Sequence, residues 1–342
     1  MSESKKYPSN IETPKLVYIV EYPAFEDIAS KQASIFWTAE ELGVEKDAND
    51  VLVKFTEGER AGLKTVQSIL TQYELMIGGE EIWGGKIYKL FPRPEIQRLC
   101  HMISCIEICT HAPFYDLINK TLNIATEEFY TQWQRDPVLA QRIEFIEEKV
   151  DSDDPLLVTA AVAFLEGVAL YSAFGFFKAF NSRGFEFIKH FVAGIDASAK
   201  DENFHAMASS LLFKTCLQER TDNGHMMGVD MAELASAIYE MAQNIYEHEL
   251  QIIERIFEVG GIRVLKKEEL IDFVQDRVNV VLAYLGYSPL FEKETGVITE
   301  WFYNQLNAFK YSDFFAAKQV QYTRNWSKAK LGFGKKDKGA EG

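Results

Sequence analysis

Apolar residues recur three and four positions apart along most of this chain of 342 residues, and strict alternation of apolar and polar residues is rare. Such spacing collects the apolar side chains on one face of a helix, so it predicts an all-α fold. The helices expected from the pattern span about residues 23–36, 38–42, 57–77, 94–122, 124–134, 137–150, 155–180, 184–218, 231–259, 266–285 and 313–322.

Proline, glycine and cap residues support several of these ends. Pro94 and Pro155 stand where two helices are expected to begin, and Gly78 stands where the third should end. Thr38 and Glu41 have the spacing of a capping box, which predicts a helix start at that point.

The helices are expected to form a single domain over residues 21–325. Residues 1–20 form an N-terminal extension, and its first 14 positions are polar without the apolar core of a signal peptide, so we expect a cytoplasmic protein. Residues 326–342 are rich in lysine and glycine, which predicts a disordered tail.

Composition narrows the classes of partner. The formal net charge of −15 argues against nucleic acid or an anionic membrane as the main partner. The four cysteines lack C-x-x-C spacing, and Cys100, Cys105 and Cys109 fall on one expected helix. This pattern indicates reduced core thiols rather than a disulfide framework.

The most apolar stretch, residues 156–177, is long enough to cross a bilayer. Its one charged residue, Glu166, lies near the middle, where an ionised group is costly in lipid. The flanking expected helices are amphipathic, as in a soluble bundle. We therefore predict a buried central helix with an inward-facing carboxylate, and no membrane partner.

Other expected helices also carry titratable groups on their inner faces. Glu74 falls on the apolar stripe of the third helix. Glu107, His111 and Tyr115 follow at intervals of four residues, so all three share one face of their helix. An unpaired carboxylate in such a place costs several kcal/mol or becomes protonated, unless a positive charge neutralises it.

The spacing Glu202-x-x-His205 adds a second Glu/His pair one helical turn apart. The complete set of inward-facing candidates is Glu74, Glu107, His111, Glu166, Glu202 and His205. Two Glu/His pairs with a lone Glu on each of two further helices are the donor set of a dinuclear metal site in a helical bundle. Four carboxylates offset the charge of two divalent ions, and two neutral imidazoles complete the ligands.

Glu247-His248-Glu249 is a further acidic and histidine cluster. Adjacent positions point to different sides of a helix, so we interpret it as a solvated or salt-bridged face.

These segments resemble the small subunit of class I ribonucleotide reductase over about residues 22–322. The matching segments, in family order, are Phe36-Trp37 before Thr-Ala-Glu-Glu-Leu, Tyr73-Glu74-Leu-Met-Ile-Gly, the Glu107/His111/Tyr115 helix, Phe-Leu-Glu166-Gly, and Lys-Asp201-Glu202-Asn-Phe-His205. The resemblance implies a ferritin-like helical bundle with additional helices and a dinuclear metal site in its core.

The family also implies a mechanism and partners. Two metal ions per chain, as an iron pair or manganese with iron, would oxidise Tyr115, and a manganese pair also suits the ligands. The resemblance implies a relay from His111 through Asp201 and Trp37 to a large subunit that reduces ribonucleoside diphosphates, so the enzyme acts only with that subunit. It further implies a homodimer and is compatible with a flavoprotein activator.

One departure concerns the spacing of the first Glu/His pair, Glu107 and His111. The family pattern is Glu-x-x-His, whereas Thr110 holds that position here and His111 comes one residue later. A one-residue helical bulge would bring His111 and Tyr115 into place. If Phe114 faces the metals instead, the oxidising equivalent stays on the metals.

Two further departures leave alternatives open. Glu74 stands where many relatives have Asp, which leaves the metal identity undecided. The segment after Trp326 contains no tyrosine to relay the radical, and Tyr322 or Trp326 are the remaining candidates. The alternative function is a ferritin-like dimetal oxidase or ferroxidase without radical transfer.

Overall fold

The computed structural model describes residues 7–227, 230–292 and 296–303, and the residues up to Phe302 form one compact unit. These residues contain helices and connecting segments, with an isolated antiparallel bridge between Ile262 and Leu265 as their one pairing of β type. The predicted all-α fold is confirmed for this part of the chain. The expected helix 313–322, the expected tail 326–342 and the relay candidates Tyr322 and Trp326 lie outside the described residues.

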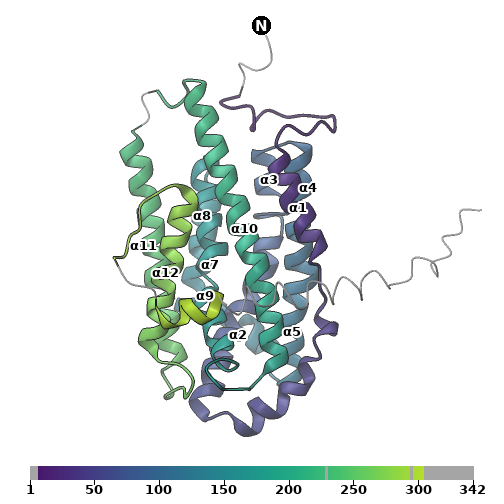
Figure 1. Ribbon diagram of the computed structural model, residues 1–342, viewed down its shortest axis with the longest axis vertical. Helices are drawn as coiled ribbons and strands as arrows, with labels where there is room; N and C mark the ends of the chain where they lie inside the picture. Colours follow the sequence, from purple (N-terminus) through teal and green to yellow (C-terminus); the bar gives the residue numbers. More distant parts are fainter. Residues whose placement is uncertain (1–6, 228–229, 293–295, 304–342) are drawn as a thin grey trace, which may run out of the picture. The chain divides into compact units, whose positions relative to one another are not determined.

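The elements are labelled as in Figure 1. The α-helices are α1 (Pro23–Ser34), α2 (Glu57–Gly78), α3 (Lys86–Leu90), α4 (Pro94–Ile106), α5 (Ala112–Thr121), α6 (Glu127–Thr131), α7 (Pro137–Val150), α8 (Pro155–Gly167), α9 (Tyr171–Ala179), α10 (Lys189–Asp222), α11 (Met231–Ile256) and α12 (Lys267–Leu285). The 3₁₀ turns are η2 (Ala39–Glu41), η3 (Val44–Asp47) and η6 (Gln132–Gln134), and the π-helical segments are η4 (Asp50–Lys54) and η5 (Glu107–His111).

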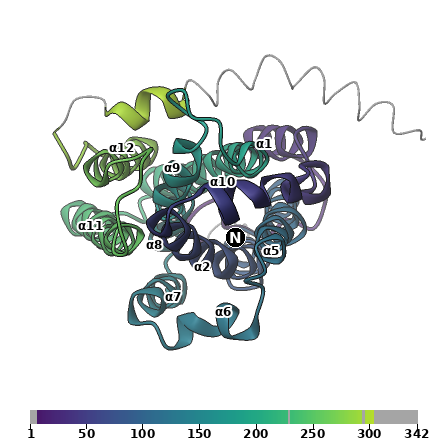
Figure 2. The ribbon, with the colours of Figure 1, turned by 90° about the horizontal axis from the view of Figure 1, so that it is seen from below.

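Helix α8 forms the centre of the bundle. It packs against α7, α10, α11 and α12, and the end-on view places it among these helices (Figure 2). The stretch Pro155–Ala179 is long and apolar enough to span a membrane, but 94% of its most apolar window is buried inside the protein. The predicted buried central helix is therefore present. Its predicted continuity to residue 180 is wrong, because Gly167 ends α8 and a turn at residues 168–170 precedes α9.

The long helix α10 begins later than the sequence pattern predicts, at Lys189 rather than near residue 184. Two carboxylates from distant turns fix this start. Asp47 accepts hydrogen bonds from the amides of His190 (2.7 Å) and Phe191 (2.8 Å), and Asp50 accepts one from the amide of Ile188 (2.9 Å). Acceptors at the first amides of a helix replace the bonds that its first turn lacks, so tertiary contacts decide where α10 starts.

Two further local predictions need correction. The expected helix 124–134 is the short α6 followed by η6. Thr38 makes no side-chain cap and precedes only a 3₁₀ turn, so the predicted capping box with Glu41 is not formed there. A capping box does start α2, where the Thr56 hydroxyl accepts from the Glu59 amide (3.2 Å) and the Glu59 carboxylate accepts from the Thr56 amide (2.9 Å).

A glycine on α10 allows close packing near the centre of the bundle. A Cβ atom at Gly194 would lie 2.2 Å from Cζ of the buried Phe114 ring. We expect Gly194→Ala to lower the free energy of unfolding by about 1–3 kcal/mol, because overpacking a filled core forces neighbours to shift. Urea denaturation measures this change.

Gly261→Ala is the matched control, since nothing lies within 4 Å of a Cβ atom there. Equal stabilities of the two variants would contradict this account of the packing.

Candidate metal centre

The six candidate ligands come together in the middle of the bundle, and all of their side chains have 0% exposure. They are Glu74 on α2, Glu107 and His111 on η5, Glu166 on α8, and Glu202 and His205 on α10. These residues form two overlapping groups, in each of which the potential ligand atoms lie within 4.8 Å of one another.

The first group consists of Glu74, Glu107, His111 and Glu202, and the second of Glu107, Glu166, Glu202 and His205. Each group contains one imidazole and one carboxylate of its own. Glu107 and Glu202 belong to both groups, so each of them could offer an oxygen to either of two ions. The arrangement matches the four-carboxylate, two-histidine site of ferritin-like bundles.

The imidazoles make the close contacts of the centre. Nδ1 of His111 lies 2.9 Å from Oε2 of Glu107 and 3.1 Å from Oε1 of Glu202. Nδ1 of His205 lies 2.6 Å from Oε1 of Glu107 and 3.3 Å from Oε2 of Glu202. Each shared carboxylate therefore turns one oxygen toward each histidine.

The predicted one-residue bulge is present, because η5 is a π-helical segment in which the Ala112 amide bonds to the Glu107 carbonyl. Pro113 explains its position. Proline has no amide hydrogen, and its ring clashes with the carbonyl four residues back, so an ordinary α-helical pattern cannot pass through this point. The wider turn places both Glu107 and His111 in the centre, whereas the Thr110 hydroxyl bonds to the Trp37 carbonyl (3.3 Å).

Helix α2 packs very closely against η5 at this bulge. A Cβ atom at Gly78 would lie 2.6 Å from Cβ of Glu107, so only glycine allows this separation. Gly78 is one turn after Glu74, and the contact thus holds the first carboxylate against the ligand-bearing segment.

The polar atoms of the centre lack enough partners within the described protein. Nε2 of His205 and Oε1 of Glu74 are buried without a hydrogen bond or ion pair, and the carboxylates of Glu74 and Glu202 meet only the imidazoles and other carboxylates of the centre. Buried polar groups nearly always have a partner, and an unpaired one costs about 1–3 kcal/mol. The donor set is also that of two divalent cations, so these residues fit a dinuclear metal site.

Burial and the charges of neighbouring groups shift the pKa values of the carboxylates and imidazoles in the centre. Burial raises the pKa of Glu74 well above its ordinary value, and the Glu107 charge raises it further. Burial also raises the pKa of Glu166, with a neighbouring carboxylate as the second cause. Burial lowers the pKa of His111 and His205, but the Glu107 charge and the hydrogen bonds to neighbouring carboxylates together outweigh it and leave both pKa values well above normal. Without cations, the centre therefore retains protons at neutral pH.

Tyr115 lies in a dry pocket on the first turns of α5. Its side chain has 0% exposure, and Ser198 is the polar side chain that interacts with its hydroxyl. Burial raises the pKa of this phenol well above its ordinary value, and the Glu74 carboxylate adds to the rise. Phe114 instead packs edge-on against the Trp37 ring, with centroids 5.5 Å apart. Leu170 and Phe174, one and two turns beyond Glu166 in sequence, are also buried.

A chain of hydrogen bonds leads from the centre to Trp37. Oδ2 of Asp201 lies 3.1 Å from Nε2 of His111 and accepts a 2.9 Å bond from Nε1 of Trp37. The rings of Trp37 and His111 are 5.7 Å apart at their centroids. The structure thus brings the three predicted relay residues into direct contact, and the Trp37 ring is half-buried.

Sequence reasoning missed two residues that hold this arrangement. Gln32 donates a 2.6 Å hydrogen bond to the second oxygen of Asp201, and Trp83 donates one to Glu166. Gln32 was detectable, because it is a polar residue on the inner stripe of α1 formed with Phe25 and Ala29. Trp83 lies in a loop. Outside a helix there is no periodic pattern from which the direction of its side chain could be predicted.

The cluster at residues 247–249 is a partly buried ionic site rather than a solvated face. Arg142 forms an ion pair with the buried Glu249 and donates a 3.2 Å bond to Nδ1 of His248. Nε2 of His248 donates to the Val138 carbonyl at 2.7 Å. The salt-bridged interpretation is confirmed, and the solvated one is wrong for His248 and Glu249, because α7 covers them.

All four cysteines are free thiols, as predicted. Cys100 and Cys216 are buried, but Cys105 and Cys109 are exposed, so the prediction that they belong to the core is wrong. They lie on the outer side of the helix whose inner side carries Glu107.

The chain is similar in sequence to known ribonucleotide reductase small subunits. The family described as "Ribonucleotide reductase, small chain" matches residues 16–297. A probable ribonucleoside-diphosphate reductase small subunit of Invertebrate iridescent virus 3 is 23% identical over 89% of this chain and 83% of its own length. The ribonucleoside-diphosphate reductase 2 subunit beta of Escherichia coli is 23% identical over 86% of this chain and 89% of its own length.

Solved structures show the same fold. The ribonucleotide reductase R2 subunit from Clostridium botulinum superposes with a TM-score of 0.72 at 22% identity, covering 84% of this chain and 89% of that one. A dimanganese(II) NrdF from Streptococcus sanguinis superposes with a TM-score of 0.70 at 18% identity, covering 84% of this chain and 98% of that one. Since the family match covers most of the helical unit and its ligand-bearing helices, the chain belongs to the ribonucleotide reductase small chain family.

Proposed function

We propose that this chain is the radical-generating small subunit of a ribonucleoside-diphosphate reductase, with the radical on Tyr115. The observation that carries the proposal is the juxtaposition of three features: the buried donor set, a fully buried phenol beside it, and a hydrogen-bonded connection from His111 to Trp37. A ferroxidase needs the first feature but neither of the others, so the radical-subunit function accounts for more of the site.

The proposed ligands divide between two ions. Glu74 and His111 would hold one, Glu166 and His205 the other, and Glu107 and Glu202 would serve both. An iron pair or manganese with iron is the proposed cofactor, and a manganese pair also suits these oxygen and imidazole donors. When bound, the metal pair would supply an oxidising equivalent drawn from oxygen or an oxygen-derived oxidant.

Tyr115 is placed to store that equivalent. Its hydroxyl is out of contact with solvent, and the packed aromatic and aliphatic neighbours exclude water that would quench a phenoxyl radical. The raised pKa keeps the phenol protonated at neutral pH, so its oxidation must release a proton together with an electron.

Asp201 is placed to couple the centre to Trp37. One of its oxygens contacts both His111 and Trp37, and the Gln32 amide fixes the other. A carboxylate held in this way can orient the imidazole and accept the indole proton while an electron passes along the same contacts.

The small-chain family works with a large subunit, so the chain has that partner. The relay through the half-buried Trp37 would lead toward it. We further propose that the chain acts in the cytoplasm as a homodimer and, with manganese bound, uses a flavoprotein activator as the source of its oxidant.

Metal loading should release protons. Because the pKa values of Glu74, Glu166 and both histidines are raised, the metal-free centre holds protons that the cations must displace. We expect about four protons to leave per chain, one from each of these groups, and metal affinity to rise as the pH rises. Calorimetry in buffers of different ionisation enthalpy measures the release, and pH-independent binding without release would contradict this account.

Removing the Tyr115 hydroxyl should abolish the radical. After metal loading and exposure to oxygen, Tyr115→Phe should bind the same metal but lose the tyrosyl signal in electron paramagnetic resonance. Tyr73→Phe is the control, since Tyr73 is also fully buried and adjoins a ligand on α2. Persistence of the signal in Tyr115→Phe would move the radical to the metals or to another residue.

Replacing Trp37 should separate radical formation from turnover. Trp37→Phe should retain metal and the tyrosyl signal, yet lower nucleotide reduction with the large subunit by about 100-fold or more, equivalent to about 2.7 kcal/mol in the barrier. Trp133→Phe is the matched control, because Trp133 is also half-buried and lies on η6 away from the centre. Full turnover by Trp37→Phe would rule out this relay.

A further inference from the structure

The described residues contain three tyrosines whose side chains are at most 1% exposed: Tyr73, Tyr115 and Tyr171. Tyr73 immediately precedes the ligand candidate Glu74 on α2. The Tyr171 hydroxyl donates to the carbonyl of Ala199 (3.4 Å), about one helical turn before Glu202 on α10. All three phenols are therefore near enough to the centre to compete for an oxidising equivalent that arises there.

An arginine guanidinium lies over two of these three rings. Cζ of Arg142 on α7 is 5.0 Å from the ring centroid of Tyr73, and Cζ of Arg277 on α12 is 3.8 Å from that of Tyr171. Both arginines are buried, at 3% and 0% exposure, so water screens their charges little. Among the described residues, no arginine or lysine lies over the ring of Tyr115.

Other contacts hold both guanidinium groups in these positions. Arg142 forms an ion pair with Glu249 and donates to Nδ1 of His248 at 3.2 Å. Nε of Arg277 donates to the Gly167 carbonyl at 2.9 Å. Buried charged groups are costly unless such contacts compensate for their lost hydration. The two cations are thus fixed features of the core beside these rings.

The guanidinium charge opposes the loss of an electron from the ring below it. The Tyr73 hydroxyl has no hydrogen-bond partner among the described residues, so no group is placed to take its proton and the electron would have to leave first. That step puts a positive charge on a ring that faces a guanidinium in a dry core, where like charges repel strongly. The Tyr171 hydroxyl contacts a backbone carbonyl, which cannot take up a proton at neutral pH.

Nearby carboxylates do not cancel the effect of the cation at Tyr73. Burial raises the pKa of Tyr73, and the charged group with the largest effect on this pKa is Arg142, which lowers it. The carboxylates of Glu249, Glu166 and Glu74 act on it more weakly. Arg142 therefore dominates the electrostatic environment of this phenol.

We propose that Arg142 and Arg277 keep the oxidising equivalent off Tyr73 and Tyr171 and so direct it to Tyr115. The inference rests on the proposed radical-generating function and explains why one buried phenol of three is oxidised. The oxidation moves one electron from Tyr115 to the oxidised centre and the hydroxyl proton to a carboxylate there, and it leaves a neutral phenoxyl radical. Arg142 and Arg277 act on the choice of tyrosine and do not take part in this transfer.

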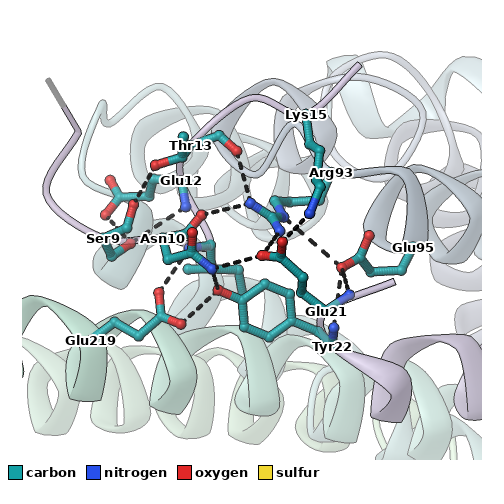
Figure 3. Close-up of polar contacts among 11 residues, drawn as sticks. Ser9, Asn10, Glu12, Thr13, Lys15, Glu21, Tyr22, Arg93, Glu95 and Glu219 are labelled. Atoms are coloured by element: carbon teal, nitrogen blue, oxygen red, sulfur yellow. Dashed lines mark hydrogen bonds and ion pairs between the residues drawn. The ribbon is translucent and has the colours of Figure 1, made fainter. Parts of the chain in front are cut away.

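A third arginine and tyrosine pair provides a matched control. Cζ of Arg93, which is 2% exposed, lies 5.2 Å from the ring centroid of Tyr22. Figure 3 shows the Tyr22 hydroxyl bonded to Glu219 (2.6 Å) and to Asn10 (2.8 Å). Glu219 lies about 21 Å along α10 from the ligand candidate His205. This pair has the same ring contact but is far from the centre.

The test removes one guanidinium from a chain that lacks Tyr115. After metal loading and exposure to oxygen, Tyr115→Phe alone should give no tyrosyl signal in electron paramagnetic resonance. Adding Arg142→Gln should raise a tyrosyl signal at least about tenfold above this background. The electron then passes from Tyr73 to the centre and its proton to Glu249, which Arg142 no longer pairs. Adding Tyr73→Phe should abolish the signal again.

Arg277→Gln in the same Tyr115→Phe background is an independent second test, so the proposal stays testable if Arg142→Gln does not fold. Its signal should disappear on adding Tyr171→Phe. Arg93→Gln is the matched control and should give no signal. Arg142→Lys retains the positive charge and should also give none. Metal content and helical circular dichroism should be the same in all of these variants.

The outcomes separate this inference from the proposed function. A wild-type signal that depends on Tyr115, with no signal in either arginine-to-glutamine variant despite two bound metals, would overturn the inference and leave the function intact. A signal in Tyr115→Phe that Tyr73→Phe removes without any arginine change would also overturn it. A wild-type chain without a tyrosyl signal, combined with signals in the arginine variants, would support protection by the arginines but contradict the assignment of the radical to Tyr115.

Discussion

The structure depends on burying four carboxylates and two imidazoles in one dry core. Such a set is strongly unfavourable by itself, because each ionised group loses its hydration and the carboxylates repel one another. Protonation relieves part of that cost, and two divalent cations would relieve more of it. The bundle must therefore be rigid enough to hold the six groups together, and long helices crossing at a central apolar helix supply that rigidity.

The same constraint explains the irregular places in the fold. The π-helical turn at Glu107–His111 takes up one extra residue, and both ends of this five-residue segment face the centre. Gly78 lets α2 approach that turn, and Asp201, next to ligand Glu202, carries the hydrogen bonds outward to Trp37. Departures from regular helix thus gather where the chemistry is expected.

Much of this was predictable from the sequence, because a charged residue on an apolar helix face is an uncommon and specific signal. The six ligand candidates and the α-helical fold follow from periodicity and residue type alone. The bulge was predicted by comparing the spacing of Glu107 and His111 with the family pattern Glu-x-x-His. Pro113, which helps to explain where the bulge lies, was visible in the sequence but was not used in that prediction. The start of α10, the break after Gly167 and the direction of Trp83 depend on contacts between distant segments, which periodicity does not record.

The most direct test of the account is anomalous diffraction from crystals of the metal-loaded protein, measured at the iron and manganese absorption edges. Two peaks per chain are expected between Glu107 and Glu202, one beside His111 and Glu74 and the other beside His205 and Glu166. A single peak, or peaks away from these side chains, would contradict the claim that the buried donor set is a dinuclear metal centre.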